Sequence, residues 1–453
     1  MNKKWVILIV VILVAGVTIF TTVKEDQHEA TISLGSDDRE LMKIAKDTYA
    51  FFEEYTDPNT GLTLDRVDLH NGEIRYEQTS PTNIAMYLLS LVAAVELEFE
   101  AVNEASEKAA RVLQTLNEME KWNGLYFNWY YTDSAELMND WGKFISTVDN
   151  GWLTAALVVI GQYFPELQMQ TEPLVVQMDY SALYDSAVGQ FHGGYDVEAG
   201  HLTDHHYGMF YSETRITSYL AIGKEDVPER HWWSLYRTFL PEDTWQSQQP
   251  NGHYEVIDGH RLYQGHYEYE GIKYVPSWGG SMFEALMPAI IIDEKNLAPN
   301  GLGLNNKRHV QAQIAYAKNQ QMDVWGFSPA AIENNYLEFG APVLGAGEGY
   351  PDGGTVTSHA SFLALEYAPE EVFHNIGVLK ELGAYGEYGF YDTVQFPKGK
   401  VNEIYLSLDQ GMILASIVNF LKDGVIRQHF HQDPIGSNGE HLLETEQFSI
   451  KEN

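Results

Sequence analysis

Residues 82–99, TNIAMYLLSLVAAVELEF, and residues 408–422, LDQGMILASIVNFLK, carry apolar side chains at the i, i+3, i+4 and i+7 spacing of a helix. The same spacing recurs from about Arg39 onward. No convincing run of alternating residues predicts strands, and there is no strand–helix–strand rhythm. Further helices are predicted at residues 40–54, 105–121, 151–163, 181–188, 212–222, 231–239, 281–292, 307–318, 358–367 and 369–382. The chain is therefore predicted to be all-α.

About twelve helices in some 400 residues pack either as a helical-repeat solenoid or as six hairpins closed into a toroid. A solenoid would show self-similarity at a period of roughly 34 to 47 residues, and the sequence has none. The stretch 246–275 is rich in His and Tyr and is too long for a plain connection, so it is interpreted as an ordered functional loop. These features favour an (α/α)6 toroid with long aromatic loops at one rim.

Charge and composition exclude several classes of function. The chain has 28 basic and 64 acidic residues, a formal net charge of −36. Such a surface repels phosphate backbones, so nucleic acid is not expected as a partner, and a neutral substrate is favoured. Cysteine is absent, which excludes disulfides, thiol nucleophiles and zinc–thiolate sites.

The first residues predict an attachment to a membrane. Lys3 and Lys4 precede an uninterrupted apolar run at residues 5–23, close to the roughly 20 residues that cross a bilayer. An uncleaved anchor is preferred over a removed signal peptide because no good cleavage site follows. The predicted organisation is an anchor or signal at 1–23, a polar tether at 24–38 and one domain at 39–453, outside the cytoplasm.

Aromatic residues form 13% of the chain and gather in loops such as 122–131. Flat aromatic faces pack against sugar rings, although they are equally common in protein cores. Several carboxylates stand beside glycine or aromatic residues: Asp149, Glu213, Glu284, Asp392 and Asp409. Glycoside hydrolysis uses two such groups. Structural roles remain open, since Asp149 could cap a helix, Glu213 could pair with Arg215 and Glu284 could brace a loop.

Eight ordered segments resemble bacterial glucoamylase-like domains. This group is related to endo-β-1,2-glucanases and to the glycosyl-processing domain of cyclic β-1,2-glucan synthases. The matching segments span most of the chain, at residues 79–84, 146–153, 211–220, 277–288, 325–328, 339–342, 389–392 and 409–412. The resemblance implies an (α/α)6 toroid with a carbohydrate cleft at one rim.

The resemblance also implies roles. Glu213 looks like the general acid. In the retaining synthase branch a nucleophilic glutamate follows the serine of the Trp-Gly-x-Ser segment, but here that position is Pro329. An inverting mechanism is therefore expected, with Asp392 as the first choice of base and Asp149 as the second. Substrate contacts are expected from Glu284, Trp129, Tyr211, Arg215, Trp278, Trp325, Tyr391, Asp409 and Gln410.

Other chemistries have weaker signals. His201, His205 and His206 lie close together in the sequence, but they form no His-Glu-x-x-His or equivalent motif with a further ligand at fixed spacing. No metal is therefore predicted, and no cofactor is expected. The predicted function is an extracellular, monomeric, inverting hydrolase of a β-glucan, with β-1,2-glucan as the expected substrate. The alternatives are a non-catalytic glycan-binding toroid of the envelope and, less favoured, a polysaccharide lyase.

Overall fold

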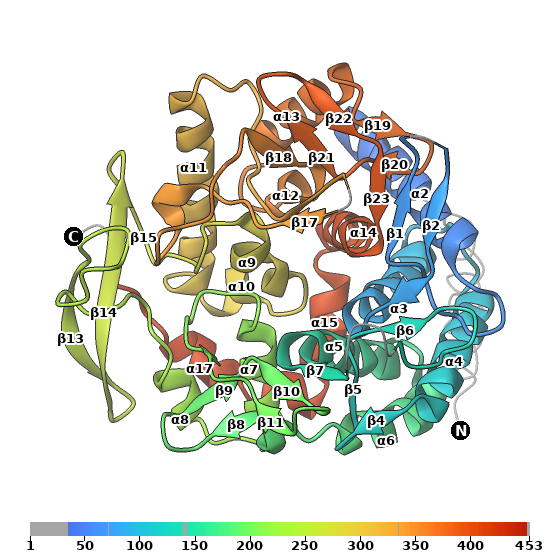
Figure 1. The fold of residues 1–453 in the computed structure, drawn as a ribbon, viewed down its shortest axis with the longest axis horizontal. Coiled ribbons are helices and arrows are strands. Elements are labelled where there is room, and N and C mark those ends of the chain that lie inside the picture. The colour runs from blue at the N-terminus through green and yellow to red at the C-terminus, as the bar shows by residue number, and fades with distance from the viewer. Residues whose placement is uncertain (1–34, 71, 139–142, 334, 451–453) are drawn as a thin grey trace, which may run out of the picture. The chain divides into compact units, whose positions relative to one another are not determined.

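A computed structural model describes residues 35–70, 72–138, 143–333 and 335–450 (Figure 1). Contacts divide the chain into a unit of residues Met1–Arg39 and a unit of residues Glu40–Asn453, and the second is described here. The predicted anchor at 5–23 and nearly all of the tether lie outside the described residues. Among the described residues, no helix combines the length and apolar character that crossing a bilayer requires.

The second unit is mostly helical and of the toroid type. Its helices are α2 (Ser36–Tyr55), α3 (Pro81–Glu96), α4 (Val102–Glu118), α5 (Thr147–Tyr163), α6 (Gln168–Gln177), α7 (Arg215–Gly223), α8 (Arg230–Trp233), α9 (Met282–Leu286), α10 (Glu294–Leu297), α11 (Leu302–Asn319), α12 (Ser358–Leu363), α13 (Pro369–Glu381), α14 (Ser407–Leu421), α15 (Val425–Gln432), α16 (Pro434–Ser437) and α17 (Glu440–Thr445). Most predicted helices are confirmed within a few residues at their ends.

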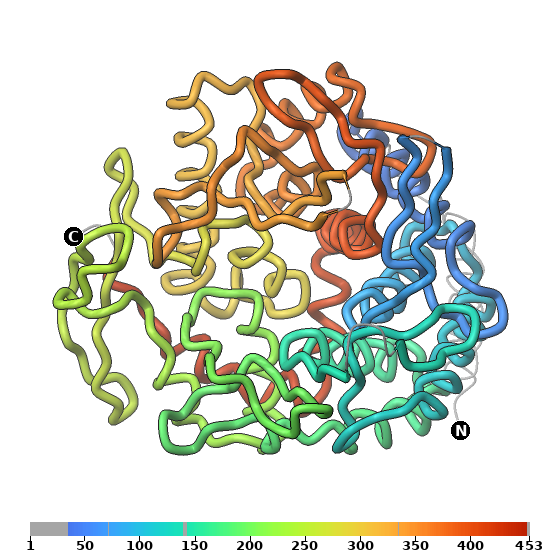
Figure 2. Tube along the Cα trace, in the orientation of Figure 1, coloured from blue at the N-terminus to red at the C-terminus, as the bar shows by residue number. Residues whose placement is uncertain are grey.

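Burial separates inner from outer helices. Almost every side chain of α3, α5 and α14 is buried, and α3 packs against both α5 and α14. Helices α2, α4 and α13 instead bury one face, as helices at the outside of a domain do. Figure 2 shows α14 and α15 running through the middle of the traced unit. At Gly151 of α5, a Cβ atom would lie 1.9 Å from Oγ1 of Thr217 in α7, so glycine permits this close helix contact.

Two predicted helices are wrong. Residues 181–188 form a short 3-10 turn and strand β8, because the Asp185 carboxylate accepts the Ala187 N–H and closes a hairpin turn. Of residues 231–239, only the first turn belongs to a helix, α8. The buried Arg237 guanidinium donates to the carbonyl groups of Trp232 and Leu235, which fixes the chain in a non-helical path.

The prediction that the chain lacks strands is also wrong, since short antiparallel pairs connect many helices. They are β1 (Arg66–Asp68), β2 (Ile74–Tyr76), β3 (Gln78–Thr79), β4 (Lys121–Trp122), β5 (Leu125–Tyr126), β6 (Tyr130–Tyr131), β7 (Phe144–Ser146), β8 (Tyr184–Asp185), β9 (Gln190–His192), β10 (Gly194–Asp196), β11 (His201–Leu202), β12 (His206–Tyr207), β16 (Ala330–Ile332), β17 (Asn335–Leu337), β18 (Thr355–Thr357), β19 (Tyr385–Gly386), β20 (Gly389–Phe390), β21 (Thr393–Gln395), β22 (Lys400–Asn402) and β23 (Ile404–Leu406).

The predicted loop 246–275 contains the longest of these sheets, formed by β13 (Asn251–Ile257), β14 (His260–Tyr269) and β15 (Ile272–Tyr274). Asp258 and Gly259 form the two-residue turn between β13 and β14, both with positive φ, which is the backbone that an Asp-Gly hairpin favours. Six of the seven β13 residues are exposed, so the strand has no apolar alternation by which the sequence could reveal it.

Candidate active site

A cleft lies where the buried helices begin. It consists of a larger chamber of about 680 Å³ and a smaller chamber of about 440 Å³, and both are lined by Glu213, Phe283, Tyr336 and Leu408. Residues at or just before the first turns of five inner helices line it, namely Thr82 of α3, Asp149 of α5, Glu213 before α7, Glu284 of α9 and Leu408 of α14. Helix N-termini carry partial positive charge, which stabilises the acidic side chains gathered there.

Glu213 stands at the junction of the two chambers. It lies in the turn that precedes α7, and the buried Arg215 secures this turn by donating to the Ser212 carbonyl at 3.0 Å. Burial raises the pKa of Glu213 to about 8, and the negative charge of Glu284 adds to this shift. The side chain is therefore protonated at neutral pH and can donate a proton into the cleft.

Glu284 lines the larger chamber but is held by its own loop. Its carboxylate accepts the Ser277 hydroxyl at 2.8 Å and the backbone N–H groups of Gly279 and Ser281, and it completes a capping box with Ser281 at the start of α9. The side chain is 4% exposed. These bonds brace the loop at residues 277–281, the structural alternative to the substrate contact expected of Glu284, and they keep a carboxyl beside Glu213.

The smaller chamber contains a second group of acids. Asp149 accepts the Thr82 hydroxyl at 2.6 Å, and its N–H donates to Ser146, the N-cap of α5. Asp65 accepts the Asn83 amide at 2.8 Å, and burial, together with the nearby Asp149, raises the pKa of Asp65. Two carboxyl groups therefore share this end of the cleft with Trp129.

Asp392 lies behind the wall of the smaller chamber rather than in it. It is 1% exposed, and one carboxylate oxygen accepts the N–H of Ala331, a residue that does line the chamber. Burial and the adjacent Asp409 raise the pKa of Asp392 well above its usual range, while burial raises the pKa of Asp409 to about 7. His359 Nδ1 lies 3.1 Å from Asp409.

Ligand atoms of Asp392 and Asp409 lie within 4.8 Å of each other. The two carboxyl groups therefore share one proton near neutral pH, because ionising both would place two negative charges side by side. The N–H of Ala331 favours the negative charge on Asp392. The other oxygen of Asp392 has no hydrogen-bond partner among the described residues. Because the pKa of Asp392 is raised further than that of Asp409, Asp392 holds the shared proton, and it can act as a base only after that proton has passed to Asp409.

The structure brings together only part of the predicted site. Glu213, Asp149, Glu284, Trp129 and Trp278 line the cleft, and so does Pro329, the position at which the retaining branch is expected to carry its nucleophile. The other predicted residues do not line either chamber: Asp392, Tyr211, Arg215, Trp325, Tyr391, Asp409 and Gln410.

Most of these have structural partners instead. The Arg215 guanidinium pairs with Glu294 at 2.6 Å, and the Tyr211 hydroxyl donates to Asn306 at 2.7 Å. Gln410 donates to the Phe390 carbonyl at 3.0 Å.

Several residues that line the cleft were not predicted from the sequence. Tyr207 lies close to the acids, since burial and then the charges of Glu213 and Asp149 raise its pKa and keep its hydroxyl protonated. The others are Asp65, Trp245, Tyr336, Glu338 and Tyr350. Only the exposed Trp245 carried a usable signal, as an aromatic residue in a polar loop.

Comparisons with known proteins agree with this architecture. Residues 205–434 match a family model described as "Putative glucoamylase", and residues 43–216 match a model described as a protein of unknown function. A cyclic β-(1,2)-glucan synthase, NdvB of Rhizobium meliloti, is 23% identical over 89% of this chain, which spans only 18% of the synthase.

Two solved structures share the fold. An endo-β-1,2-glucanase from Chitinophaga pinensis, in complex with sophorotriose and glucose, superposes with a TM-score of 0.72 at 15% identity, over 92% of this chain and all of the glucanase chain. A β-1,2-glucanase from Parabacteroides distasonis gives 0.73 at 17% identity, over 92% of this chain and 61% of its own.

Proposed function

Because the chain belongs to the glucoamylase-like family whose model it matches over residues 205–434, we propose that it is a glycoside hydrolase acting on a β-glucan, with β-1,2-glucan as the substrate. One observation carries this proposal. A cleft of sugar-binding size and aromatic lining holds Glu213 at its centre, and the raised pKa of about 8 keeps that carboxyl protonated. The glucans bound or cleaved by the structural relatives support the choice of linkage.

The proposed reaction inverts the anomeric carbon. Glu213 gives its proton to the departing glycosidic oxygen as the bond to the anomeric carbon breaks. A water molecule attacks the opposite face of that carbon and releases its proton to a carboxylate. Pro329 on the cleft wall cannot act as a nucleophile, which supports inversion over retention.

The proposed base is Asp392, and Asp149 is the alternative. Asp392 accepts a proton only if strand β16 moves, because Ala331 covers it. Asp149 faces the cleft already, but Thr82 engages one of its oxygens. Asp392→Asn should abolish turnover under our first assignment, while Asp149→Asn should then weaken substrate binding and leave measurable turnover. The reverse pattern would assign the base to Asp149.

A panel of defined glucans, with the first-formed anomer followed by NMR, tests the whole proposal. We expect products from β-1,2-glucan with inverted configuration. Glu213→Gln should lose about 10²- to 10⁴-fold in rate while it still binds the glucan. Binding of glucans without turnover by the unaltered protein would instead make it a glycan-binding protein, and a retained anomer would overturn both base assignments.

Finer features of fold and location belong to this proposal. The buried α3, α5, α7, α9, α12 and α14 are proposed as the inner members of six helical hairpins, an (α/α)6 toroid. Residues 1–23 are proposed as an anchor that holds a monomeric domain outside the cytoplasm, as the two lysines ahead of the apolar run indicate. Deletion of residues 1–23 should then release active protein from the membrane fraction.

A further inference from the structure

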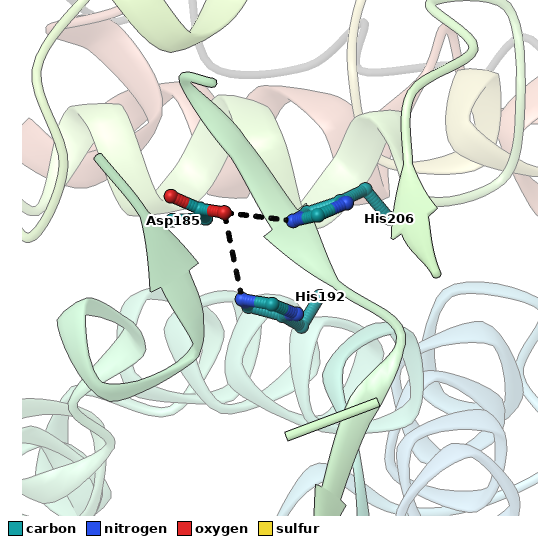
Figure 3. Close-up of side chains that lie close together, drawn as sticks. All are labelled: Asp185, His192 and His206. Carbon is teal, nitrogen blue, oxygen red and sulfur yellow. Dashed lines mark hydrogen bonds and ion pairs between the residues drawn. The ribbon is translucent and has the colours of Figure 1, made fainter. Parts of the chain in front are cut away.

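Three side chains from adjacent strands converge beside the larger chamber, and the site described above does not use them. Asp185, His192 and His206 lie on β8, β9 and β12, which form one antiparallel sheet in the order β12-β9-β8. His206 stands directly opposite His192, and Asp185 stands opposite Gln190, two residues before His192. Because alternate residues share a face of a sheet, all three side chains point to the same side (Figure 3).

Without an ion, His206 and Asp185 are within hydrogen-bond distance, and the spacings of the three residues lie on either side of those of a ligand set. Nε2 of His206 lies 3.0 Å from Oδ2 of Asp185, and Nε2 of His192 lies 3.9 Å from the same oxygen. All three ligand atoms lie within 4.8 Å of one another. Ligands about 2.0 to 2.2 Å from a tetrahedral zinc ion stand about 3.3 to 3.6 Å apart, so small side-chain adjustments would enclose an ion.

Hydrogen bonds on the outer side fix the orientation of two ligands. His192 Nδ1 lies 2.7 Å from the Thr203 carbonyl, which can only accept, so this nitrogen carries the proton. Nε2 is therefore the nitrogen of His192 that faces the Asp185 carboxylate. Oδ1 of Asp185 accepts the Ala187 N–H at 2.9 Å, which leaves Oδ2 facing the histidines. Such outer partners are typical of metal-binding His and Asp.

We propose that Asp185, His192 and His206 bind one divalent transition-metal ion of the zinc class, with solvent in the fourth position. The three side chains are 27%, 15% and 25% exposed, which leaves room for that solvent ligand. His206 and Gln190 line the larger chamber, so the ion holds β12 and the neighbouring Tyr207 against the cleft.

These three residues differ from the histidines considered in the sequence, His201, His205 and His206, for which no metal was predicted. His201 is exposed, and its ring bonds the Leu202 carbonyl, while His205 lines the cleft. The liganding residues are separated by strand turns rather than by a zinc-motif spacing, so no motif marks them. The proposal is independent of the proposed hydrolase activity.

Metal binding to the purified full-length protein tests the site. Protein stripped with EDTA is titrated with ZnCl₂ by calorimetry and with CoCl₂ by visible absorption. We expect one ion per chain and the intense visible bands of a low-coordinate Co²⁺ site. Asp185→Asn and His192→Ala should each lower the affinity at least tenfold. His253→Ala is the matched control, because His253 faces Glu255 at 3.8 Å on the surface and no third ligand joins them in the part of the chain that the structure describes.

Thermal unfolding gives a second readout. Zinc should raise the Tm of the unaltered protein and of His253→Ala, and it should leave the Tm of Asp185→Asn nearly unchanged. Asp185→Asn keeps the oxygen that accepts the Ala187 N–H, so it tests the ligand without opening the hairpin. Binding with equal affinity in the unaltered protein and in Asp185→Asn would overturn the proposal. So would a protein that binds less than one ion per chain.

Discussion

Substitution of the central carboxyl by its neutral isostere, Glu213→Gln, should stabilise the protein, and increasingly so as the pH rises. A raised carboxyl pKa means that the native state keeps a proton which the unfolded chain releases. Between 4.5 and about 8, the two pKa values of Glu213, the free energy of unfolding therefore falls with rising pH. Glutamine carries no such proton, so the variant escapes this loss.

The magnitude follows from the pKa shift, at about 1.4 kcal/mol per pH unit. At pH 5.5 the carboxyl destabilises the native state by about 1.4 kcal/mol, and at pH 9 by about 4.7 kcal/mol. The advantage of Glu213→Gln should thus grow by about 3 kcal/mol over this range.

Urea unfolding of the purified protein at pH 5.5 and pH 9, followed by fluorescence, measures the difference. Glu371→Gln on the exposed first turn of α13 is the matched control, and its effect should be small at both pH values. A Glu213→Gln advantage that does not change with pH would refute the reasoning. It would mean that the carboxyl titrates in the native state as it does in water.

The remaining predictions concern rate, stability and substrate contact. kcat/KM on the natural glucan should fall as the pH rises through about 8, because Glu213 then loses the proton it must donate; a pH profile that stays flat to pH 9 would contradict this. Glu294→Ala should lower the free energy of unfolding by about 3–5 kcal/mol in urea, since it leaves the fully buried Arg215 charge unpaired. Trp278→Ala should raise KM for long glucans more than it lowers kcat, because this exposed ring lines the larger chamber, whereas Asp149 lines the smaller one; an equal loss in kcat would argue against a binding role.

The inner helices were predictable because their pattern is continuous. Residues 82–99 and 408–422 are apolar over most of their length, and such segments fold as buried helices in α3 and α14. The strand pair β13–β14 was not predicted because both faces of β13 meet solvent, and only the Asp258-Gly259 turn marked it. The spacing of apolar residues therefore predicts helices and strands that pack against the core. It does not predict exposed hairpins, which are defined by their turns.

Some residues of the candidate site were predictable from their local sequence, and others were not. Glu213 and Asp149 stand at helix starts in apolar surroundings, a local feature that the sequence displays. Asp65 becomes part of the site only through Asn83, and Tyr207 lies close to Asp149, which is far from it along the chain. Asp392 has similar glycine and aromatic neighbours in the sequence, but it lies behind Ala331 and does not line the cleft. Contacts between residues that are far apart in the chain are set by tertiary packing, and a single sequence does not predict them.

The absence of a side chain at Gly151 lets helices α5 and α7 lie close together beside the cleft. Gly151 follows Asp149 by two residues, and its contact partner Thr217 follows Glu213 by four, so one missing methyl group sets the lateral spacing between the two segments that carry these acids. An alanine at this position would wedge α5 and α7 apart without touching either carboxyl. Whether a water molecule fits between a sugar and a distant carboxylate is decided by differences of a few ångströms. A steric change on the hidden side of the helices could thus retune the reaction geometry while every reacting group stays the same.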